Sequence, residues 1–100
     1  MIAIEPVIAP AAILSAISAE RARSPEIVGY HKLRARSSGA RRFVDLHLQF
    51  RSGTTLERAH QVAHRLRDAI EAEVPTSEVL IHVEPEQSFR RSATGPLRSG

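Results

Sequence analysis

Histidine is the residue type with the most chemistry to offer in this chain. The chain has five histidines and no cysteine. The imidazoles are His31, His47, His60, His64 and His82, and Glu84 follows two residues after the last of them. Imidazole and carboxylate groups together bind zinc and its first-row neighbours, and the lack of cysteine excludes thiolate ligands and disulfides. The sequence therefore predicts a metal site with nitrogen and oxygen donors.

Residues 41–50 alternate as a β-strand with one apolar face. The apolar face comprises Val44, Leu46, Leu48 and Phe50. Because side chains alternate along a strand, His47 points away from this core face, beside Asp45. Residues 27–36 form a partner strand, and residues 37–40 (Ser-Ser-Gly-Ala) suit the loop of a hairpin.

A third strand is predicted over residues 78–84. Its core face comprises Val79, Ile81 and Val83. His82 and Glu84 face the other way, and residues two apart on a strand share a side, so both can bind one ion. If this strand neighbours residues 41–50, His47 comes within ligand reach of His82.

Two helices complete the pattern. Residues 11–23 contain good helix formers, and Thr54-x-x-Glu57 predicts a capping box in front of a longer helix that ends before Pro75. The apolar stripe expected on the longer helix comprises Leu56, Ala59, Ala63, Leu66 and Ile70. One sheet covered on one face by both helices would bury these apolar faces.

His31 and His60 fit the predicted site less directly. Strict alternation puts His31 with Leu33, expected in the core, so His31 joins the other ligands only at the entrance of its strand. His60 lies on the flank of the helical stripe and would have to reach round a sheet edge or across to a second subunit. His64 faces water, and Gln61 stands where a metalloprotease HExxH motif has glutamate, so that motif is absent.

The order of elements predicts a small α+β sandwich with a three-stranded mixed sheet. We expect an N-terminal arm over residues 1–10, one domain over residues 11–86 and a flexible basic tail over residues 87–100. Three strands leave open edges, so a homodimer is expected. Pro6 and Pro10 interrupt the apolar start of the chain, which is too short for a membrane span, and Glu5 stands where a secretory signal carries positive charge.

The net charge is +3, and thirteen of the fourteen cations are arginine. The arginines cluster at 34, 36, 41 and 42 and again at 90, 91 and 98. Nucleic acid or an anionic membrane could bind such patches. No aromatic residues interleave with the arginines as a single-strand stacking platform requires, so we expect solvated surface and no nucleic acid partner.

Two other classes of function remain as alternatives. A metal-independent dimerisation or interaction module would use the basic surface. A hydrolase would need a zinc-activated water with Glu84 as base, but the sequence shows no nucleophile and no oxyanion donor, so we expect no enzyme.

Residues 25–86 resemble the C-terminal cytoplasmic domain of cation diffusion facilitator metal transporters. The resemblance rests on four motifs in combination: H-x-L-R-x-R before a glycine, V-D-L-H, A-H in a helix, and V-x-I-H-x-E-P. It implies a metallochaperone-like (ferredoxin-like) fold in the cytoplasm, a homodimer and divalent cations bound near the subunit interface. The metals implied are zinc or another transition metal such as iron, manganese, cobalt, nickel or cadmium.

The resemblance also assigns ligand positions. By it, His31, His47, His60 and His82 are metal ligands, and Glu84 stands where several relatives carry aspartate. The six membrane helices of such transporters are missing here. We therefore expect either the regulatory part of a zinc or transition-metal efflux system or a free-standing relative that senses or buffers metal or pairs with a full-length transporter. Because imidazole must be neutral to coordinate, binding should weaken below about pH 6.5.

Overall fold

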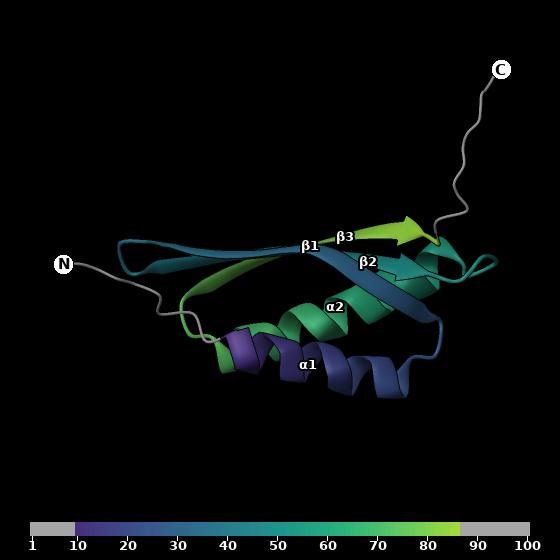
Figure 1. The fold of residues 1–100 in the computed structure, drawn as a ribbon, viewed down its shortest axis with the longest axis horizontal. Helices are drawn as coiled ribbons and strands as arrows, with labels where there is room; N and C mark the ends of the chain where they lie inside the picture. Colours follow the sequence, from purple (N-terminus) through teal and green to yellow (C-terminus); the bar gives the residue numbers. More distant parts are fainter. Residues whose placement is uncertain (1–9, 87–100) are drawn as a thin grey trace, which may run out of the picture.

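The computed structural model describes residues 10–86, which form two helices and three strands (Figure 1). The elements are α1 (Pro10–Arg23), β1 (Ile27–Ser38), β2 (Arg41–Phe50), α2 (Leu56–Glu73) and β3 (Ser77–Pro85). This order confirms the predicted α+β succession of helix, strand, strand, helix, strand. Residues 1–9 of the expected arm and the expected basic tail, residues 87–100, lie outside the described residues.

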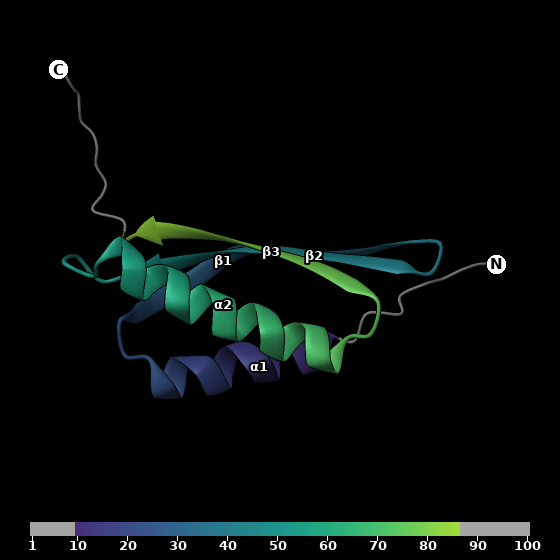
Figure 2. The same cartoon turned by 180° about the vertical axis from the view of Figure 1, so that it is seen from behind.

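The strands form one mixed sheet in the order β1-β2-β3. β1 pairs with β2 antiparallel, and β2 pairs with β3 parallel, with α2 as the crossover between the parallel strands. Both helices lie on the same side of the sheet (Figures 1 and 2). Within the described residues the other side, here called the open face, carries no helix, as predicted.

The β1–β2 hairpin is tighter than expected. The loop was predicted over residues 37–40, but the strands continue to Ser38 and resume at Arg41. The turn is therefore the pair Gly39 and Ala40. Gly39 has φ 62°, a conformation that glycine adopts without steric cost, so the two-residue turn allows two more residues of β1 to pair with β2.

The core lies between the helices and the inner face of the sheet. Its largest fully buried side chains are Ile13 and Ile17 of α1, Val44, Leu46 and Leu48 of β2, and Val62, Leu66 and Ile70 of α2. The predicted helical stripe was wrong at one end: Leu56 is 66% exposed, whereas Val62 is fully buried. Leu56 is the first residue of α2, and the buried stripe begins one turn later at Ala59.

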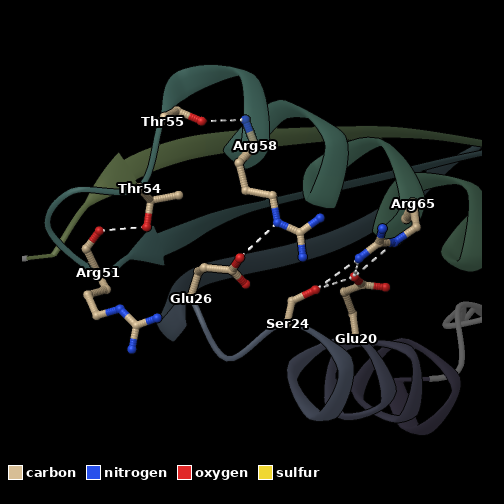
Figure 3. A network of polar contacts seen from close by, with 8 residues as sticks. All are labelled: Glu20, Ser24, Glu26, Arg51, Thr54, Thr55, Arg58 and Arg65. Atoms are coloured by element: carbon tan, nitrogen blue, oxygen red, sulfur yellow. Dashed lines mark hydrogen bonds and ion pairs between the residues drawn. The ribbon is translucent and has the colours of Figure 1, made fainter.

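The N-cap of α2 is Thr55, one residue later than predicted. Thr55 Oγ1 accepts a hydrogen bond from the Arg58 amide at 3.0 Å, and its backbone is extended at φ −70° and ψ 153°. The hydroxyl of Thr54 instead donates to the Arg51 carbonyl at 2.7 Å (Figure 3). Because that turn already uses the Thr54 hydroxyl, the adjacent threonine caps the helix.

Polar contacts fix α1 to α2 (Figure 3). The Glu20 carboxylate accepts hydrogen bonds from Ser24 Oγ at 2.7 Å and from Arg65 Nη2 at 2.7 Å, and both Glu20 and Ser24 are buried. A second pair, Arg58 Nε to Glu26 Oε2 at 2.8 Å, ties α2 to the start of β1. Neither helix is long and apolar enough to cross a membrane.

Candidate metal centre

A β-bulge in β1 decides which way His31 points. His31 pairs with His47, but the next pair along the strands is Arg34 with Asp45. Two residues of β1, Lys32 and Leu33, therefore stand opposite one residue of β2, and Lys32 has a positive φ of 56°. An extra residue of this kind breaks the alternation of side chains.

The bulge corrects the expectation that His31 shares a face with Leu33. Leu33 packs against the core, whereas His31 lies on the open face with its pairing partner His47. His31 lies within β1 and not at its start. It reaches the open face because the extra residue of the bulge reverses the alternation of side chains between His31 and Leu33. No local signal marks Lys32, which is neither glycine nor asparagine.

Three of the predicted ligands converge on the open face: His31 of β1, His47 of β2 and Glu84 of β3. His31 Nε2 lies 2.9 Å from Glu84 Oε1, and His47 Nδ1 contacts the other oxygen, Oε2. One ligand atom from each residue lies within 4.8 Å of the other two. The side chains are 39%, 23% and 29% exposed, respectively, so the group is reachable from solvent but shielded by the sheet.

His82 lies beside this cluster without joining it. It pairs with His47 across β2 and β3, and the two rings stack with centroids 4.3 Å apart and planes 15° apart. The His82 side chain is exposed. The rings of His31 and His47 meet edge to face, with their centroids 5.3 Å apart. The open face thus carries a row of three imidazoles, two of which contact Glu84.

His60 is not brought to the cluster within the described residues of this chain. It lies on α2 and is exposed, and α2 is on the opposite side of the sheet from the open face. His64, one turn later, is also exposed and accepts a hydrogen bond from Arg67 Nη2 at 2.8 Å. The interpretation of His64 as a surface residue agrees with this position.

The electrostatics of the cluster favour an ionised carboxylate. Burial by itself raises the pKa of Glu84, but hydrogen bonds from His47 and His31, together with the charges of both imidazoles, outweigh burial and lower it. Asp45, on the same face, instead pairs with Arg34 Nε at 3.5 Å. Glu84 is therefore the carboxylate that the two imidazoles share.

The donor set fits a transition metal ion. Zinc takes imidazole nitrogen and carboxylate oxygen at about 2.0–2.2 Å in tetrahedral sites. Two nitrogens and one oxygen within 4.8 Å of one another need only small side-chain movements to contact one ion. The exposed edge of the cluster leaves room for a fourth ligand, either water or a side chain from elsewhere.

Comparison with known proteins decides the family. Residues 9–86 match the family described as the cytoplasmic domain of cation efflux proteins. The chain belongs to this family. The resemblance to cation diffusion facilitators is thereby confirmed, and the family is one of cation transport, not a known enzyme class.

The relatives and solved structures of the family agree. The chain is 37% identical over 73 residues to the cation-efflux pump FieF of Pectobacterium atrosepticum, covering 73% of this chain and 24% of that protein. With FieF of Cronobacter sakazakii the identity is 41% over 61 residues, covering 61% and 20%. The chain thus spans about a quarter or less of the length of these curated relatives.

Among solved structures, one of the candidate zinc transporter CzrB matches 84% of this chain and all of that chain at TM-score 0.72 and 28% identity. The metal-bound C-terminal domain of the CzcD transporter from Thermotoga maritima matches 73% of this chain and 86% of that chain, at TM-score 0.61 and 26% identity. The metallochaperone-like fold expected from the sequence is confirmed by these neighbours and by the order of elements.

Proposed function

We propose that this chain is a homodimeric, divalent-cation-binding regulatory domain of a cation diffusion facilitator-type efflux system. The observation that carries the proposal is the convergence of His31, His47 and Glu84 on the open face of the sheet. Each comes from a different strand. One bound ion would therefore link all three strands at a surface that faces away from the helices.

The donor types suggest which cations the site would take. Two imidazole nitrogens with one carboxylate favour zinc, iron, manganese, cobalt, nickel or cadmium over magnesium and calcium, which take oxygen ligands. The likeness to CzrB, named as a candidate zinc transporter, supports zinc. His82 stacks on His47 and is placed to serve as an additional ligand after a rotation of its side chain.

A second subunit would complete the arrangement. Within the described residues the open face has no helical cover, and Leu80 on that face is 57% exposed. In residues 10–86, β1 and β3 are the edge strands of the sheet, and proteins commonly cover such edges. His60 is on the helical side of the same chain, so we propose that it serves the metal centre of a partner subunit.

Metal would act by tightening this assembly. Without metal, Glu84 is held only by two hydrogen bonds from imidazoles. His31, His47 and Glu84 would instead hold a divalent ion, which would offset the charge of the carboxylate and link β1, β2 and β3. If one arrangement of the two subunits binds metal better, binding shifts the population toward it. A transporter would use that shift to regulate transport, and a free-standing domain would use it to sense or buffer metal.

Calorimetric titration of chelator-stripped protein with zinc at pH 7.5, with sedimentation in parallel, tests the proposal. We expect saturable binding on a dimer and loss of most binding in His31→Ala and in His47→Ala, with both variants folded. His64→Ala is the matched control and should bind like the unmodified protein. Unchanged stoichiometry in both His31→Ala and His47→Ala would refute the site.

A further inference from the structure

The half of the β1–β2 hairpin that ends in the turn carries a dense group of cations. The group, here called the basic hairpin, comprises Lys32, Arg34, Arg36, Arg41 and Arg42. Residues 27–44 contain no aspartate or glutamate. Four of the five side chains are exposed, and Arg42 is half-buried.

Few of these charges are neutralised by the described part of the chain. Arg34 pairs with Asp45 at 3.5 Å and Arg41 with Glu78 at 2.5 Å, so five cations meet two carboxylates and three positive charges remain. Both ion pairs are exposed, and exposed pairs are worth only about 0–1 kcal/mol. These arginines can therefore exchange a carboxylate for a phosphate at little cost.

Contacts with neighbouring residues position three of the guanidinium groups. Arg36 pairs with Phe43 across the hairpin, and the guanidinium carbons of Arg36 and Arg41 lie 5.2 and 5.9 Å from the centre of the Phe43 ring. Arg42 Nη1 donates to Pro75 O and Thr76 Oγ1, which are uncharged, so these hydrogen bonds do not offset the positive charge of Arg42. Guanidinium groups held in this way are suited to bidentate contact with phosphate oxygens.

The basic hairpin also has a defined place in the molecule. Its tip lies at the same end as the start of α1, and it extends beyond the helices (Figures 1 and 2). The end of α1 and the β2–α2 loop lie at the opposite end. Charge collected at one end of an elongated domain suits a flat anionic surface better than a groove that follows a nucleic acid strand.

We propose that the basic hairpin binds the anionic phospholipid headgroups of a membrane surface. Because the chain belongs to a cation efflux family, we expect a lipid bilayer close to it. Each arginine near an anionic leaflet strengthens membrane binding about fivefold. The only aromatic side chain in the patch, Phe43, is flanked by guanidinium groups, which leaves no platform for base stacking. Arg36 and Arg41 lie nearer the turn of the hairpin than His31 and His47 of the metal centre.

Flotation of the full chain with phosphatidylcholine vesicles, with and without 30 mol% phosphatidylserine (about a third), tests the proposal at low and high salt. We expect binding only with phosphatidylserine, loss of binding at high salt, and about 30-fold weaker binding in the Arg36→Gln/Arg41→Gln variant. The control variant Arg21→Gln/Arg51→Gln removes the same charge at the opposite end and should bind within about fivefold of the unmodified chain.

Three results would overturn the proposal. They are no binding to phosphatidylserine vesicles at low salt, equal weakening in the two double variants, and binding to a DNA duplex without binding to these vesicles. Residues 87–100 are the same in all variants, so arginines there cannot account for a difference. Circular dichroism and zinc binding should be unchanged in both double variants, which separates this test from that of the metal centre.

Discussion

The bulge at Lys32 can be tested by mutation, because the positive φ of Lys32 is part of the irregularity that directs His31 to the open face. A residue with a side chain at φ 56° is strained, and relief of left-handed strain is worth about 1–2 kcal/mol. Glycine loses more backbone entropy on folding than lysine does, which offsets about 0.5–1 kcal/mol of this gain. Lys32→Gly is therefore expected to stabilise the domain by about 0.5–1 kcal/mol, or a few degrees in melting temperature.

Isoleucine at the same position should do the opposite. A β-branched residue at positive φ is strongly disfavoured, so Lys32→Ile is expected to cost about 1–3 kcal/mol. Part of this cost can be avoided if the strand straightens, which would turn His31 toward the core and weaken zinc binding. Urea denaturation and zinc titration of both variants measure the two effects.

Ser37 provides the matched control for this experiment. It lies in the same strand, is exposed and has no positive φ. At an ordinary strand position isoleucine is favoured over glycine, so Ser37→Ile should be more stable than Ser37→Gly, the reverse of the order at Lys32. If the order of glycine and isoleucine is the same at both positions, the account of the bulge is wrong.

Three further predictions concern the fold. Burial alone raises the pKa of Glu20, but hydrogen bonds from Arg65 and Ser24 and the charges of Arg65 and Arg23 lower it overall, below the ordinary 4.5. The ion pair of Glu20 therefore stabilises the fold at pH above the unfolded-state pKa, and this stabilisation is lost as pH falls through the folded-state pKa. In acid titration, Glu20→Gln should lose less stability over this pH range than the unmodified protein. Leu66→Ala should cost about 2–5 kcal/mol and the control Leu56→Ala within about 0.5 kcal/mol in urea denaturation, and equal costs would contradict the observed core. Thermal unfolding should show that Thr55→Ala costs about 1 kcal/mol more than Thr54→Ala.

The regular parts of the sheet were open to prediction from sequence. β2 alternates from Val44 to Phe50, so the direction of His47 followed from its neighbours Leu46 and Leu48. The same alternation put His82 and Glu84 on the open face, and their parallel register with β2 brought Glu84 to His47. Period-two patterns carry this information wherever a strand has no bulge.

The departures depend on tertiary contacts. The bulge follows from how β1 fits its partner and the core, and lysine has no intrinsic preference for the positive φ that it adopts. Thr54 and Thr55 are equally good capping residues, and the choice between them depends on the hydrogen bond to the Arg51 carbonyl. Leu56 has the right period for the helical stripe, but only the fold shows that its side chain is exposed.

The most direct test of the central claim is anomalous scattering at the zinc edge from crystals of the zinc-loaded protein. The account predicts a peak within bonding distance of His31, His47 and Glu84. It would be contradicted by saturated protein that shows zinc only at other residues, such as His64, or no ordered zinc on the open face.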